Sequence, residues 1–232
     1  QVASTTGSCQ LSIAFGSSAY WIRGDSSQNV RFGAGILDSS GNVGTAASVL
    51  TSTGSGICWA SAGGFEPDAD ENLVAGTKAG EDLDGSNACY NVFVGYYAGK
   101  ENTSGHTNIA IGRKALGEGV TTGDYNIAFG FQAGVKMTSG EGNVLLGYNA
   151  GKSICASNHS VIIGHYAGED STTNAGCNVF IGYHGGKGNT TGCENIYMGV
   201  QAGCTDNTGH RNVYVGQTAG RIQASGRKDN VF

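Results

Sequence analysis

The chain has 232 residues, with 41 glycines, a single proline, 13% charged residues and a formal net charge of −5. Glycine normally makes up about 7% of a protein and charged residues about 25%. This glycine content disfavours helices, because each interior glycine costs up to ~1 kcal/mol. Collagen is excluded because it needs abundant proline and glycine at every third position, and the 39% hydrophobic content argues against disorder. The composition therefore indicates a β-rich, turn-rich protein, with no apolar run long enough for a transmembrane helix and no basic stripe for nucleic acid.

The first part of the chain carries only traces of a repeat. In residues 1–35, the segments Ser12–Gly16 and Asn29–Gly33 have related sequences and begin 17 residues apart. We interpret residues 1–35 as N-terminal degenerate solenoid repeats, and residues 36–71 as an irregular insertion or degenerate turns. The chain begins with Gln1, which we interpret as a processed end, as after removal of a signal peptide.

A regular repeat fills residues 72–232, as nine copies and a truncated tenth. Each copy has Asn (Ser in one copy), three apolar residues, Gly, two variable residues and usually Ala-Gly, and successive copies start 17 to 19 residues apart. The apolar run predicts one short strand that ends at the glycine. A unit of this size cannot bury its own apolar face, so copies are expected to stack at about 4.8 Å. The predicted fold class is all-β, a β-solenoid (β-roll or β-helix) of 17–18-residue repeats, assembled as a homotrimeric fibre.

The asparagine that opens each repeat recurs at the same place in every predicted turn of the solenoid. A stacked amide can donate a hydrogen bond to one neighbour and accept one from the other. We therefore predict a structural ladder made of Asn72, Asn91, Asn108, Asn126, Asn143, Asn178, Asn195, Asn212 and Asn230.

Strand alternation divides the three apolar positions between two faces. Counting the asparagine as position one, positions two and four share a face and position three lies on the other. We assign positions two and four to the solenoid interior, which leaves position three exposed as an apolar stripe. Such a stripe indicates an interface, most simply in a threefold bundle. The predicted interprotomer stripe contains Phe93, Leu145, Ile162, Phe180, Tyr197 and Tyr214.

The unit Asn-Val-x-Ile-Gly-x-x-Ala-Gly resembles the repeats of bacteriophage tail-fibre proteins, and it looks like the left-handed β-roll of trimeric autotransporter adhesin heads. The resemblance extends from Asn72 to Phe232, with weaker copies at Ser12 and Asn29. It implies an elongated homotrimeric fibre, extracellular or carried on a virion, that spaces or presents a binding tip.

Cysteines and glycosylation sequons add candidate modifications. An extracellular location permits disulfides, and cysteines on adjacent turns of the solenoid would lie within bonding distance. The candidate pairs are Cys177 with Cys193 and Cys193 with Cys204, with free buried thiols as the alternative. Three sequons fall in predicted loops, at Asn102, Asn158 and Asn189.

No pattern of residues predicts catalysis, a metal site or a cofactor. We expect a non-enzymatic structural subunit of an extracellular fibre or filament, built by stacking and by packing between protomers. Its expected partner is itself, as a homotrimer, a head-to-tail polymer joined through the truncated repeat, or both. The alternatives are a tail-fibre or cell-surface adhesin shaft that binds a glycan or another host receptor, and, third, an ice-binding solenoid. The expected location is extracellular, on a cell surface or on a virion surface, with no nucleic-acid partner and no membrane insertion.

Overall fold

The computed structural model describes residues 67–85, 87–172, 176–221 and 226–231, together with the backbone of five earlier strands. The chain divides into two units, residues 1–64 and residues 65–232, and each is described by itself.

The first unit contains two small antiparallel sheets. One has the order β1-β2-β3 and the other pairs β4 with β5. Their bounds are Ser12–Ala14 for β1, Tyr20–Gly24 for β2, Val30–Phe32 for β3, Ser48–Ser52 for β4 and Ile57–Ser61 for β5.

This arrangement corrects the expectation of solenoid repeats in residues 1–35, because solenoid strands are parallel and these strands alternate in direction. The physical reason lies between the two repeat-like segments. Strand β2 contains Tyr20, Trp21 and Ile22, which favour a strand where the regular repeats carry a turn. Short connections join antiparallel strands, whereas parallel strands need a longer crossover. Strands β4 and β5 give residues 36–71 a hairpin, and part of this segment lies outside the described residues.

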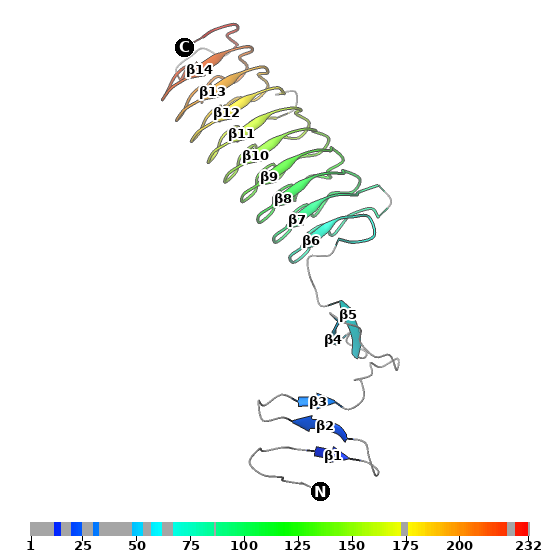
Figure 1. The fold of residues 1–232 in the computed structure, drawn as a ribbon. Coiled ribbons are helices and arrows are strands. Elements are labelled where there is room, and N and C mark those ends of the chain that lie inside the picture. The colour runs from blue at the N-terminus through cyan, green and yellow to red at the C-terminus, as the bar shows by residue number, and fades with distance from the viewer. Residues whose placement is uncertain are drawn as a thin grey trace. The chain divides into compact units, whose positions relative to one another are not determined.

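The second unit is a β-solenoid with one short strand in each turn, and we call each turn a rung. Its nine strands form one parallel sheet in chain order, from β6 to β14, as Figure 1 shows. Each strand residue pairs with the residue at the same repeat position in the next rung, as Leu145 does with Ile162. The strands are Leu73–Ala75, Val92–Val94, Ile109–Ile111, Ile127–Phe129, Val144–Leu146, Val161–Ile163, Val179–Ile181, Ile196–Met198 and Val213–Val215.

The glycine after each strand forms a corner that only glycine can occupy. Gly147 follows β10 and has a φ of 134°, a conformation that residues with a Cβ rarely adopt. A Cβ on Gly147 would lie 2.6 Å from the carbonyl oxygen of Gly164 in the next rung. The corner therefore needs glycine both for its backbone conformation and for the close stacking of rungs.

Two further corners use residues other than glycine in the left-handed conformation. In the second rung these are Tyr90, directly before the asparagine, with a φ of 59°, and Tyr97, with a φ of 57°. Equivalent positive φ values recur from rung to rung. Because each rung bends in the same way, successive strands arrive in register.

The asparagine at position one points into the rung and links it to its neighbours. Asn143 is fully buried, and its Oδ1 accepts the backbone N–H of Ser160 in the next rung at 3.0 Å. Its Nδ2 donates to the carbonyl of Ser157 at 2.7 Å, which closes its own rung. Asn126 accepts the N–H of Asn143 in the same manner, at 3.1 Å. The amides therefore hold the rungs together and also fix the end of each turn segment.

The ladder of hydrogen bonds continues where another residue replaces the asparagine. Asp68 precedes the first rung, and its carboxylate accepts the N–H of Asn72 at 2.8 Å, as an asparagine of an earlier rung would. In the sixth rung, the shorter Ser160 accepts the N–H of Asn178 at 3.3 Å.

Position three lies on the same face as the inward asparagine and forms the core. These side chains are buried in the single chain and pack against the alanines that follow the glycine corner, such as Ala150. The core members at position three are Phe93, Ala110, Ala128, Leu145, Ile162, Phe180, Tyr197 and Tyr214.

The core changes character in the last two complete rungs, where tyrosines bring hydroxyl groups to position three. The rings of Tyr197 and Tyr214 stack with centroids 4.8 Å apart. Both hydroxyls donate to Oδ2 of Asp206, at 2.8 and 3.3 Å, and Asp206 is fully buried. Burial and the nearby carboxylate raise the pKa of Tyr197 well above its usual range and that of Tyr214 to about 12. The C-terminal core is therefore held by hydrogen bonds as well as by packing.

Candidate assembly surface and adjoining hollow

The outer face of the nine-stranded sheet is apolar on every rung. Positions two and four point outward, and none of them carries a polar or charged side chain. We call this set the outer sheet face. Position two contributes Leu73, Val92, Ile109, Ile127, Val144, Val161, Val179, Ile196 and Val213, and position four contributes Ala75, Val94, Ile111, Phe129, Leu146, Ile163, Ile181, Met198 and Val215.

The outer sheet face is only partly covered in the single chain. Most of its side chains are half-buried by their neighbours above and below, but Phe129 is 55% exposed and Val215 is 57% exposed. Nine strands at about 4.8 Å spacing make the face roughly 40 Å long. A continuous apolar surface of this length on a water-exposed sheet is typical of an interaction surface.

The structure corrects the predicted interprotomer stripe. Its members, among them Phe93, Leu145 and Tyr197, have no exposed surface in the single chain and form its core. The expected division of the strand was therefore inverted. Position one is inward because its amide bonds inside the rung, and alternation then places position three inward and positions two and four outward.

Rings stack along the corner that follows the strands, at position six. The ring of Tyr148 is nearly parallel to those of Phe131 and His165, with centroids 4.9 and 4.8 Å away. Tyr183 continues the stack beyond His165, with a centroid distance of 5.7 Å. Because rings in such a stack face each other, only their edges meet solvent, and their faces are not free to receive another ring or a sugar.

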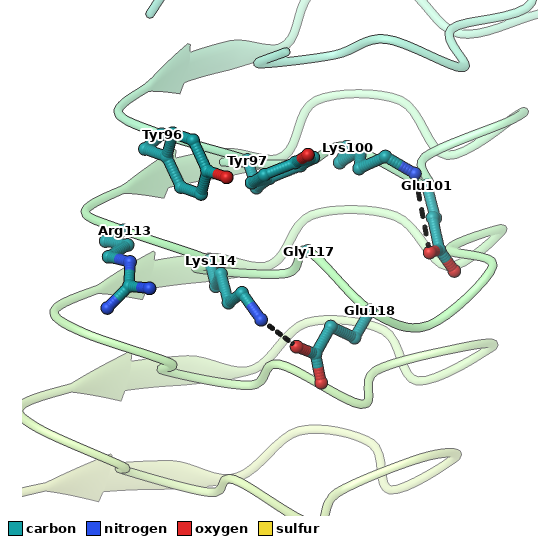
Figure 2. A pocket seen from close by; sticks show the side chains of 8 residues that line it. All are labelled: Tyr96, Tyr97, Lys100, Glu101, Arg113, Lys114, Gly117 and Glu118. Atoms are coloured by element: carbon teal, nitrogen blue, oxygen red, sulfur yellow. Dashed lines mark hydrogen bonds and ion pairs between the residues drawn. The ribbon is translucent and has the colours of Figure 1, made fainter. Parts of the chain in front are cut away.

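The ring stack ends at the guanidinium of Arg113. Beside this guanidinium lies a hollow on the turn side of the solenoid. The hollow has a volume of about 430 Å³. Figure 2 shows that its residues come from the turn segments of two consecutive rungs. They are Tyr96, Tyr97, Lys100 and Glu101 from one rung, and Arg113, Lys114, Gly117 and Glu118 from the next.

The hollow extends from the corner after the strands, where Tyr96 and Arg113 lie, onto the turn segments. The turn segment that carries the hollow packs on the inner side of its strand, since a Cβ on Gly99 would lie 2.5 Å from the ring of Phe93. Side chains that point outward from this segment therefore point away from the sheet.

The charged groups of the hollow differ in how they are paired. Lys114 bonds to Glu118, and Lys100 lies 3.7 Å from Glu101. Arg113 has no carboxylate within ion-pair distance among the described residues. Its guanidinium lies 5.7 Å from the ring centroid of Tyr96 and 5.4 Å from that of Phe131. The hollow thus presents an exposed cation that is held between two rings.

The expected disulfides are not formed, because the five described cysteines, including Cys177, Cys193 and Cys204, are free. Cys177 is exposed directly before its asparagine, whereas Cys193 lies one position earlier in its repeat and contacts Nδ1 of His210 at 3.1 Å. Cys204 follows strand β13 and Cys193 precedes it, so they lie on different segments of the rung. Burial raises the pKa of the Cys193 thiol. Cys9 and Cys58 belong to the part of the chain whose side chains are not described.

Burial corrects two of the three predicted glycosylation sites, Asn102 and Asn189. Asn102 and Asn189 have no exposed surface and point into their rungs, so the folded solenoid has no room for a glycan on either side chain. Asn158 is half-buried, and its Oδ1 accepts the backbone N–H of Glu141 at 3.0 Å. The sequence places all three in turns, but it does not reveal which turn residues point inward.

Comparisons of the chain with protein-family models, curated proteins and solved structures found no match. Within the described ranges there is no group of three or more histidine, cysteine, aspartate or glutamate side chains arranged to hold a metal ion. No helix in the described part of the chain has the length and apolar character needed to cross a membrane.

Two sets of residues in these surfaces escaped the sequence analysis. The first is the outer sheet face, which could have been found by following alternation from the asparagine, because position one and position three must share a face. The second is the charged lining of the hollow. The sequence gives a weaker signal for this lining. Tyr96 and Arg113 occupy the same repeat position in consecutive rungs, but they are different residue types, so the repeat does not mark them as a set.

Proposed function

We propose that the solenoid is a structural rod that assembles with copies of itself through the outer sheet face, as a subunit of an extracellular fibre. The observation that supports this most strongly is the unbroken apolar character of that face over all nine strands. Burying an aliphatic side chain contributes about 1.5 to 3 kcal/mol when it is fully transferred from water. Partial burial repeated over this many side chains favours association.

A second copy of the chain is the partner that best fits this face. The face repeats at the spacing of β-strands and carries no charge that would select a different protein. Another copy offers an apolar surface of the same length and the same spacing. Three rods that turn their outer sheet faces to a common axis form a closed assembly, in which each rod is covered by its two neighbours.

The test is a charged substitution in the middle of the face, compared with one outside it. Ile163→Glu places a carboxylate on the outer sheet face at β11, and Lys136→Glu changes an exposed turn residue as the matched control. Sedimentation equilibrium should show a trimer for the wild type and for the control, and a monomer for Ile163→Glu. Circular dichroism should show that both variants keep their strands.

Two outcomes would contradict the proposal. One is a wild-type protein that stays monomeric at concentrations of tens of micromolar. The other is an Ile163→Glu variant that associates as the wild type does. A dimer in place of a trimer would retain the surface and correct the symmetry.

A further inference from the structure

The hollow on the turn side combines three features of a binding site for an anionic ligand. It is concave, with a volume of about 430 Å³, within the range of small-ligand sites. It contains more cations than carboxylates, with Lys100, Arg113 and Lys114 against Glu101 and Glu118. None of the residues that line it belongs to the outer sheet face, so the inference does not rest on self-association.

Arg113 differs from the two lysines of the hollow in what surrounds its charge. Lys100 and Lys114 are close to carboxylates, whereas Arg113 meets only aromatic rings among the described residues. The rings on either side limit the positions that the guanidinium can take, and its N–H groups have no protein partner among the described residues. A guanidinium held in this way is prepared for two parallel hydrogen bonds to a planar carboxylate.

The remaining lining is suited to hydroxyl groups. Glu101 and Glu118 can accept hydrogen bonds from hydroxyls, the two lysines can donate to them, and the hydroxyls of Tyr96 and Tyr97 can do both. Lys100 also lies 3.8 Å from both Glu81 and Asp82, and Lys114 is paired with Glu118. The charge of Arg113 is therefore the one that a carboxylate on the ligand would neutralise. A heavily sulfated chain would bring several charges close to Glu101 and Glu118 and would be repelled.

We propose that this hollow binds a uronic acid residue of an acidic polysaccharide, with the carboxylate on Arg113 and the sugar hydroxyls on the glutamates and lysines. The rings of Tyr96 and Phe131 flank Arg113 and limit its position, and they do not serve as a platform for the sugar. The site is open, so the neighbouring sugars of a longer chain can extend out of it along the rod.

The experiment uses isothermal titration calorimetry on the full chain with three probes. The first is tetragalacturonic acid, the second is its fully methyl-esterified form, and the third is a heparin tetrasaccharide of the same length. We expect the free acid to bind at least about tenfold more tightly than the ester, because hydrogen bonds between charged groups are lost in the ester. The sulfated probe should bind more weakly than the free acid.

Variants then assign the binding to Arg113. Arg113→Gln should weaken binding of the free acid by at least about tenfold, and Arg113→Lys should recover only part of it, because lysine keeps the charge but not the planar fork. Lys136→Gln removes an exposed cation outside the hollow and should leave affinity unchanged. Matching thermal unfolding curves for these variants would show that the fold is intact.

Several results would overturn the inference. They are no heat of binding with the free acid, equal affinities for the acid and the ester, tighter binding of the sulfated probe, or an unchanged affinity in Arg113→Gln. None of these results bears on the sedimentation test of the outer sheet face, so the two proposals can fail separately.

Discussion

Leu145 and Leu146 are adjacent and chemically identical, but they lie on opposite faces of the same strand. Leu145 has no exposed surface and belongs to the core of the single chain, whereas Leu146 is half-buried on the outer sheet face. The same contrast holds for the inner and outer faces of the whole sheet. Hydrophobicity therefore does not identify the inside of this solenoid. Inside and outside differ in what covers the side chain. The turn segment of the same rung covers the inner face, whereas a second copy of the chain would cover the outer face in the proposed assembly.

The largest loss of stability is expected for a substitution of Gly147, the residue after Leu146. This substitution tests how closely the rungs stack. Gly147→Ala introduces a Cβ that meets the carbonyl of Gly164, while Gly216→Ala places a Cβ that has no atom of the described residues within 4 Å. Both glycines have similar φ values, 134° and 129°, so the backbone strain is shared. We expect Gly147→Ala to lower the free energy of unfolding by about 4 kcal/mol, and Gly216→Ala by clearly less. Chemical denaturation measures both, and equal losses would show that rung contact is unimportant.

The two leucines provide the direct comparison of the faces. Leu145→Ala should cost about 3 kcal/mol of unfolding free energy, since it leaves a cavity in the core. Leu146→Ala should cost less than about 1 kcal/mol in the dissociated chain and should weaken self-association instead. Denaturation at low concentration together with sedimentation separates the two effects. If Leu146→Ala lost as much stability as Leu145→Ala in the monomer, the assignment of the outer face would be wrong.

The smallest effect concerns the polar part of the inner face and appears at alkaline pH. Tyrosine ionises at about pH 10 in an unfolded chain, whereas the fold raises the pKa of Tyr214 to about 12 and that of Tyr197 further. The unfolded state therefore loses these protons first, so stability is fully present below pH 10 and falls as pH rises towards 12.

Denaturation at a series of pH values measures this loss. Tyr214→Phe removes one titrating hydroxyl, so it should reduce the slope between pH 10 and 12, at a cost of about 1 kcal/mol at neutral pH. An unchanged slope in this variant would assign the alkaline loss to other groups.

Much of the solenoid follows from the repeat alone. The regular spacing and the glycine after each apolar run predict short parallel strands that stack in register, and the recurring asparagine predicts a ladder. The same reasoning failed for residues 1–35, because similarity to the repeat at Ser12 and Asn29 does not outweigh the strand-forming residues between them. The hollow could not be derived either, since the outward direction of Arg113 and its place between two rings depend on the path of the turn segment.

The sequence by itself determined that these residues stack, because a rung of this length with one short strand has no other way to cover its apolar side chains. Only the tertiary structure decided which apolar side chains face inward. Both faces of each strand are apolar, so hydrophobicity fits either choice equally well. Two consecutive residues before each strand set the inward direction. The first has the left-handed conformation, and the second is the asparagine, whose amide must find its hydrogen-bond partners inside the rung. Alternation then sets the side of every other residue in the strand.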